Sequence, residues 1–131
     1  MEQRVGSVEP LRSHEWTLTK LALNDDDLIA SLTESDAANL EASGLDARAH
    51  ALVRIGALLA LDAAPPAYAS VVRLAERAGV SVPEIVGVLV AIAPCIGVAR
   101  TVSAAPELAL ALGFDVDDVI ERDRDRGSAG L

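Results

Sequence analysis

Arg100 is the cation that stands out in this sequence, because it lies within a long aliphatic stretch. No charged residue lies between Glu84 and Arg100, or between Arg100 and Glu107. An unpaired guanidinium is very costly to bury, so Arg100 must meet a carboxylate, reach water or bind an anionic ligand. Thr101 and Ser103 place hydroxyl groups nearby. Arg100 and Ser103 are therefore candidate substrate-binding residues, and a structural ion pair of Arg100 is the alternative.

His50, Arg54 and Tyr68 form a second candidate set. His50 and Arg54 are four residues apart, so on a helix they share one face. A guanidinium can hold a carboxylate through two parallel hydrogen bonds, and imidazole can exchange a proton near neutral pH. We predict His50 as a catalytic residue, with Arg54 and Tyr68 as substrate-binding residues. The alternatives are solvent exposure, an ion pair of Arg54 with Asp62 or Glu76, and simple packing of the Tyr68 ring.

Other kinds of chemistry find little support in the sequence. The single cysteine, Cys95, excludes an internal disulfide and a Cys-x-x-Cys pair, and its aliphatic neighbours predict a buried, unreactive thiol. No set of His, Asp, Glu and Cys has metal-ligand spacing, and no glycine-rich phosphate loop follows a strand. We therefore expect neither a metal nor a cofactor.

Caps, prolines and glycines predict helices along the whole central part of the chain. Asp46 can begin a helix that runs to about Leu61, and two prolines then open a second helix from about Pro66 to Arg77, which closes at Gly79. These two form a helical hairpin. The predicted elements after it are a capping-box helix over Val82–Ile92, a helix over Pro94–Leu112 that Pro106 kinks or splits, and a short helix from Asp115 to about Asp123.

The predicted fold class is all-α, with one domain. A chain of 131 residues suits a single core, and with only three aromatic residues that core must consist of small aliphatic side chains. We expect an N-terminal arm over 1–23, a helical domain over 24–122 and a flexible C-terminal tail over 123–131. Within the domain, Asn24 can cap a short helix, and a second one over Asp36–Ala42 stops at Gly44.

Charge and hydropathy restrict the partners. A formal charge of −9 repels phosphate backbones, and few aromatics are present to stack bases, so nucleic acid is not expected. The longest charge-free run, Ile85–Ala99, is too short to span a membrane. The N-terminus does not read as a secretory signal, so a cytoplasmic location is expected. The helix over Val82–Ile92 is apolar on nearly every face, which predicts homo-oligomers.

Three segments of the chain resemble the carboxymuconolactone decarboxylase family. They are Leu45–Leu61 (LDARAHALVRIGALLAL), Arg73–Ala93 (RLAERAGVSVPEIVGVLVAIA) and Gly97-Val98, and the resemblance covers about Leu45 to Leu112. It implies an alkylhydroperoxidase-D-like helical bundle built on a helical hairpin. It also implies assembly into a homotrimer or homohexamer.

The sequence departs from the catalytic motifs of this family. The redox branch carries a Cys-x-x-Cys pair followed by His, with a Glu one helix earlier. The corresponding positions here hold other residues: Ala51, Ala63, Ala64, Pro66, Ala67, and Ser70 or Val71. Thiol-dependent peroxidase activity is therefore not expected. The decarboxylase branch has no cysteine pair but places a His where Val71 stands.

Two functional hypotheses follow. The resemblance implies a cofactor-free lyase of the decarboxylase type, acting on a small organic acid or lactone held by Arg100 or Arg54. The alternative is a non-catalytic small-ligand-binding or assembly protein that keeps the family fold. A cavity in which the candidate residues converge favours the enzyme, whereas a protein carboxylate paired with Arg100 favours the alternative.

Overall fold

The computed structural model describes residues 14–129, and in this range the chain is helical throughout, with no strand. The all-α fold class is thus confirmed. The chain divides into two compact units, Met1–His50 and Ala51–Leu131, which we describe separately. The sequence had predicted one helical domain over 24–122.

The first unit contains short helices, and those that begin after residue 25 have well-formed N-caps. They are α2 (His14–Ala22), α3 (Asp26–Thr33), α4 (Asp36–Ser43) and the first turn of α5 (Ala47–Leu61). The carboxylate of Asp25 accepts the backbone N–H of Leu28 at 2.9 Å, and this bond lowers the pKa of Asp25 below its ordinary value. None of the residues of α2, α3 or α4 is buried. This unit therefore depends on caps more than on a core.

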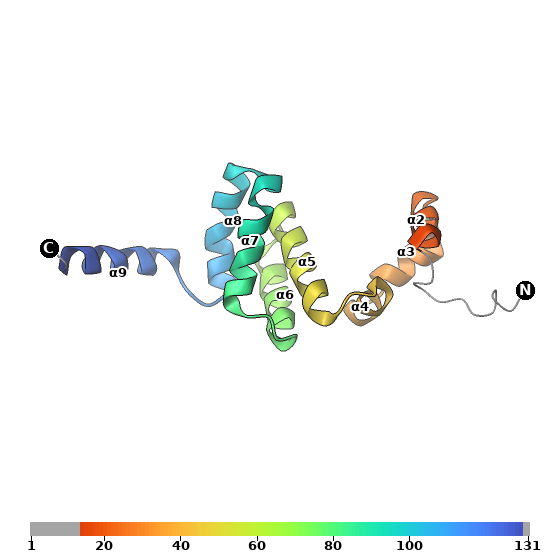
Figure 1. The fold of residues 1–131 in the computed structure, drawn as a ribbon, viewed down its shortest axis with the longest axis horizontal. Coiled ribbons are helices and arrows are strands. Elements are labelled where there is room, and N and C mark those ends of the chain that lie inside the picture. The colour runs from red at the N-terminus through yellow and green to blue at the C-terminus, as the bar shows by residue number, and fades with distance from the viewer. Residues whose placement is uncertain (1–13, 130–131) are drawn as a thin grey trace, which may run out of the picture. The chain divides into compact units, whose positions relative to one another are not determined.

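The second unit contains the hydrophobic core. It consists of the rest of α5 together with α6 (Pro65–Arg77), α7 (Val82–Ile96), α8 (Val98–Ala111) and α9 (Val116–Ala129). Helices α5 to α8 lie side by side as a bundle (Figure 1). Its largest fully buried side chains are Ile55, Leu59 and Ile85, and small residues such as Ala75 and Ala104 let the helices approach closely.

The predicted start and stop signals around the hairpin are confirmed. The Asp46 carboxylate accepts the N–H of Ala49 at 2.8 Å at the start of α5. At the start of α7, Ser81 and Glu84 form both bonds of a capping box. Gly79 has a φ of +82°, the left-handed conformation that ends α6 without a Cβ clash.

The boundary between α7 and α8 differs from the prediction. Pro94 lies inside α7, which continues to Ile96, and the break falls at Gly97, whose φ of +86° favours glycine. Helix α8 continues through Pro106, so the predicted split does not occur. A proline removes one backbone donor, and packing of α8 against α7 and α6 keeps the helix continuous.

The structure describes part of each end of the chain. The predicted arm over 1–23 contains α2, whereas its first thirteen residues lie outside the described range. The predicted tail over 123–131 is largely helical, because α9 extends to Ala129. The cap of α3 is Asp25 instead of Asn24, which adopts a left-handed φ of +57°. Asp117 and Asp118 in the first turn of α9 and Arg126 in its last turn interact favourably with the helix dipole. These charges stabilise the helix as far as Ala129.

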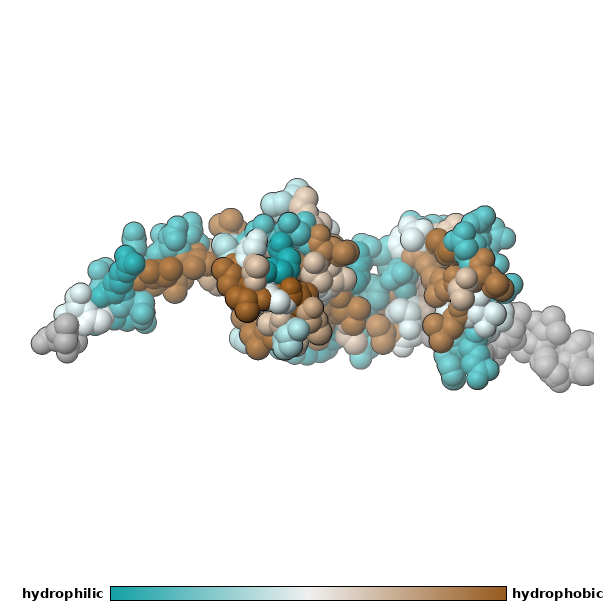
Figure 2. Space-filling model, turned by 90° about the horizontal axis from the view of Figure 1, so that it is seen from above, coloured by the Kyte–Doolittle hydropathy of each residue, from teal (hydrophilic) through white to brown (hydrophobic). Residues whose placement is uncertain are grey.

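Aliphatic side chains remain exposed on the second unit. They include Val82, Val86 and Val90 along α7 and Val98, Val102 and Leu110 along α8. Figure 2 shows brown, hydrophobic surface on the helical bundle between teal patches. Within residues 14–129, no helix combines the length and the hydropathy that crossing a membrane requires.

We expect Leu59→Ala to reduce the free energy of unfolding by about 2–5 kcal/mol, because the fully buried Leu59 side chain would leave a cavity. The measurement is denaturant unfolding followed by circular dichroism. Val53→Ala on the exposed side of the same helix is the matched control, with a change within about 0.5 kcal/mol. Equal losses in both variants would contradict this description of the core.

Candidate functional site

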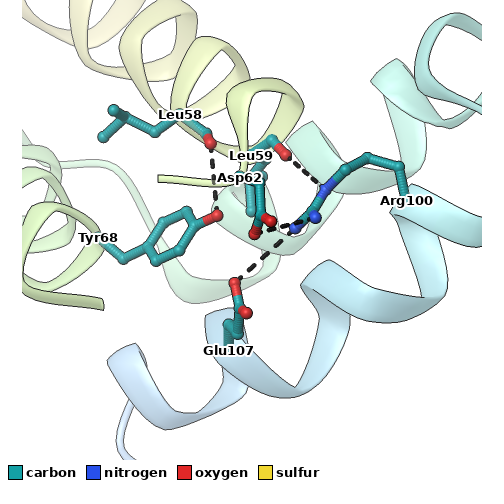
Figure 3. A network of polar contacts seen from close by, with 6 residues as sticks. All are labelled: Leu58, Leu59, Asp62, Tyr68, Arg100 and Glu107. Atoms are coloured by element: carbon teal, nitrogen blue, oxygen red, sulfur yellow. Dashed lines mark hydrogen bonds and ion pairs between the residues drawn. The ribbon is translucent and has the colours of Figure 1, made fainter. Parts of the chain in front are cut away.

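Arg100 is the centre of a polar network at one end of the α5–α6 hairpin (Figure 3). Its Nε donates to the backbone carbonyl of Leu59 at 3.1 Å, and its Nη1 lies 2.9 Å from a carboxylate oxygen of Asp62. Its Nη2 lies 3.8 Å from a carboxylate oxygen of Glu107. All three nitrogens of the guanidinium therefore face groups of the same chain.

Two regions of the chain bring these groups together. Leu59 is in the last turn of α5, and Asp62 follows directly after this helix with a left-handed φ of +56°. Asp tolerates this conformation better than most residues do. Arg100 and Glu107 are seven residues apart in α8, two turns along one face. The network thus connects the end of α5 to α8.

Tyr68 packs beside this network from α6. Its side chain is buried, and its hydroxyl donates to the backbone carbonyl of Leu58 at 3.3 Å. Burial raises the pKa of Tyr68 above its ordinary value of 10.0, and the nearby negative charge of Glu107 raises it further, while Arg100 acts in the opposite direction. Tyr68 is therefore a neutral phenol at physiological pH and cannot serve there as a base.

Two buried atoms of the network lack a hydrogen bond. They are Nη2 of Arg100 and Oε2 of Glu107, which face each other at a distance too long for a hydrogen bond. The side chain of Arg100 is only 18% exposed, so its attraction to Glu107 is weakly screened. The two carboxylates together outweigh the one guanidinium, which leaves the network with a formal charge of −1.

His50 belongs to a different contact. Its side chain is buried, and Nε2 lies 2.8 Å from Oδ1 of Asn39 in α4. The amide nitrogen of Asn39 in turn donates to the carbonyl of Leu32 at the end of α3. His50, Asn39 and Leu32 thus join three helices of the first unit. This contact accounts for the buried imidazole without a substrate.

The remaining predicted residues occupy varied environments. Arg54 is half-buried on α5, and Ser103 is exposed on α8. The prediction that Cys95 is buried was wrong, because its thiol is exposed. In α7 the inward positions are Ile85, Leu89 and Ile92, and Cys95 lies outside this stripe. Of the predicted site residues, the structure brings Tyr68 and Arg100 into one network.

The sequence reading missed two roles in the network. It considered Asp62 only as a partner for Arg54, and Glu107 only as the end of a charge-free stretch. The spacing of seven between Arg100 and Glu107 was a usable signal, since it places both on one helical face. The contribution of the Leu59 carbonyl has no sequence signal, because any residue supplies a carbonyl.

Comparisons with known protein families, with curated proteins and with solved structures gave no match for this chain. Among residues 14–129, His, Cys, Asp and Glu side chains do not gather in a group of three or more that could hold a metal ion. The assignment of a function therefore has to be argued from the network and the surface.

The raised pKa of Tyr68 can be measured directly, because Tyr68 is the only tyrosine of the chain. We expect the absorbance titration of the folded protein to have its midpoint above 10.0, and Glu107→Gln to lower that midpoint by removing a negative charge. A raised pKa means that the folded state holds its proton more tightly, so the stability contributed by this group is present below pH 10 and is lost as the pH rises through the folded-state pKa. A midpoint at or below that of the chemically unfolded chain would contradict the burial of Tyr68.

Proposed function

We propose that this protein is a non-catalytic helical assembly protein, whose α7–α8 surface binds further copies of the chain. The observation that carries this proposal is the pairing of Arg100 with its own chain. The guanidinium contacts a carbonyl of α5 and the carboxylates of Asp62 and Glu107. Its charge therefore serves the fold, and the main reason to expect a bound organic acid is removed.

Electrostatics also argue against an anionic substrate at Arg100. An anion would have to displace Asp62 or Glu107, or bind next to both of them. The formal charge of −1 of the network repels it, with water screening the Asp62 carboxylate, whose side chain is 62% exposed, more than that of Glu107, at 33%. The Nε2 of His50 is already engaged with Oδ1 of Asn39 in the first unit.

The α7–α8 surface supports self-association. Val86, Leu89, Ala105, Leu108 and their neighbours line an apolar hollow of about 210 Å³. Ligand pockets for drug-sized molecules are commonly about 300–1,000 Å³, so this hollow better suits a protruding aliphatic side chain of a protein. Val90 and Val102 extend the exposed apolar surface along the same two helices. A second copy of the chain supplies side chains of this kind.

The resemblance to carboxymuconolactone decarboxylases agrees with this proposal in part. It implies a homotrimer or homohexamer, and either assembly needs a surface for contact between copies. The decarboxylase branch places a His at the position of Val71, and Val71 here is a buried core residue. We therefore favour the assembly hypothesis over the lyase hypothesis.

A second candidate function is the binding of a small polar molecule at the same network. The unpartnered Nη2 of Arg100 and Oε2 of Glu107 would match a molecule with one acceptor and one donor. Such binding stabilises the folded state, so thermal unfolding with and without small amides or acids tests it. A rise in Tm that Glu107→Gln abolishes would favour this candidate.

The assembly proposal is tested by the molar mass in solution, measured by size-exclusion chromatography with light scattering. We expect an oligomer for the wild type and dissociation for Val90→Glu, because an added charge at an apolar interface must be desolvated. Val53→Glu on α5 is the matched control, since Val53 and Val90 are similarly exposed, at 61% and 68%. A monomeric wild type, or dissociation by Val53→Glu alone, contradicts the proposal.

The structural role of Arg100 makes a separate prediction. Arg100→Met would leave Glu107 without its cation, and we expect a loss of unfolding free energy on the order of 3 kcal/mol. Adding Glu107→Gln should recover a large part of that loss, because the unpaired charge is then gone. Arg73→Met, at an exposed position of α6, is the control, with a change within about 0.5 kcal/mol. An unchanged or increased stability of Arg100→Met would instead indicate a ligand-binding arginine.

A further inference from the structure

Helix α9 exposes part of an apolar face in the part of the chain that the structure describes, while Val116 at its start lines the hollow of α7 and α8. Val116, Val119 and Ile120 follow the spacing of one helical face, and Val119 and Ile120 are each 44% exposed. No residue of α9 is buried. Figure 2 shows this face as a brown strip along the helix at the left of the view. Isolated helices of about 12–15 residues are marginal in water, so the 14 residues of α9 need a packing partner.

The charges of α9 are ordered along the helix in a self-complementary way. Asp117 and Arg124 are seven residues apart, and Asp115 and Arg126 are eleven apart. Asp117 and Arg124 are separated by two turns and so lie along one side of the helix. Asp115 immediately precedes α9, where its carboxylate accepts the backbone N–H of Asp117 at 2.9 Å, and it lies about three turns before Arg126. Both pairs are centred on the same point, midway between Ile120 and Glu121. The two pairs flank the apolar face on opposite sides.

We propose that α9 pairs in antiparallel orientation with α9 of a second copy, crossing it between Ile120 and Glu121. In an antiparallel pair the same sides of two helices meet. Asp117 then faces Arg124 of the partner copy, and Asp115 faces Arg126 of the partner copy, each twice by symmetry. A parallel pair in register would place acids beside acids and arginines beside arginines.

The apolar face fits this crossing as well. Ile120 lies next to the crossing point and packs against Ile120 of the partner copy. Asp123 is the one acid on the apolar face, and it weakens the pair. Two helices of this length pair weakly on their own, so the α9 pair depends on another contact that holds the two copies together. The inference therefore rests on the self-association through α7 and α8 proposed above.

Cysteine cross-linking tests the proposed geometry in the full chain. The natural thiol is removed by Cys95→Ser, and Ile120→Cys is compared with Asp118→Cys, which lies on the opposite face of α9. In a glutathione redox buffer, two neighbouring thiols introduced by Ile120→Cys are oxidised to an intermolecular disulfide, while glutathione disulfide is reduced to two glutathione thiols. We expect at least tenfold more cross-linked dimer for Ile120→Cys than for the control. Equal yields overturn the α9 pairing, whereas the molar mass of the wild type separately decides the α7–α8 proposal.

Charge exchange tests the predicted ion pairs. In the Ile120→Cys background, Asp117→Arg should lower the yield of cross-linked dimer several-fold, and adding Arg124→Asp should restore it. Asp123→Leu should raise the yield, because the acid would leave the apolar seam. A double variant that stays as low as Asp117→Arg, or a lower yield for Asp123→Leu, contradicts the antiparallel pair. Circular dichroism of each variant checks that the helices are kept.

Discussion

The second unit depends on the neutralisation of one partly buried cation, Arg100. A guanidinium with 18% exposure cannot remain unpaired at acceptable cost, and here it is held by groups from two regions of the chain. The carbonyl of Leu59 and the carboxylate of Asp62 come from the end of α5, and Glu107 comes from α8. Arg100 therefore joins the hairpin to the later helices. The core side chains Leu59 and Tyr68 pack directly beside this connection.

This constraint also determines what the network can do chemically. Tyr68 is held neutral by burial and by Glu107, and Arg100 is matched by two carboxylates. Neither group is available as a base or as a free anion site. The exposed aliphatic side chains of α7, α8 and α9 instead offer area for protein contacts. The pairing of Arg100 and the exposed aliphatic side chains together support the assembly proposal over the lyase hypothesis.

Local signals in the sequence predicted most of the helices. The Asp46 cap, the capping box at Ser81 and Glu84, and Gly79 each act through bonds within a few residues, and each is where the sequence placed it. The errors concern Pro94 and Pro106, which packed helices tolerate because neighbouring helices stabilise them. The division into two units also escaped prediction, because it depends on contacts between distant residues.

The candidate site was only partly predictable, because it also depends on contacts between residues that are distant in the sequence. The sequence identified Arg100 as a cation that needs a partner, and it named a structural ion pair as one outcome. It could not identify Asp62 and the Leu59 carbonyl, because they lie about forty residues away in the chain. His50 was identified as a residue of interest, but its partner Asn39 lies in an element outside the predicted hairpin.

The claim that Arg100 serves the fold is tested most directly by nuclear magnetic resonance of its side chain. The Nε–H group of Arg100 is hydrogen-bonded to Leu59 and partly buried, so its signal should exchange slowly with water. We predict that small organic acids and lactones leave its chemical shift unchanged at millimolar concentration. A saturable shift of this signal with one such compound, with faster exchange in its absence, would contradict the account and restore Arg100 as a ligand-binding residue.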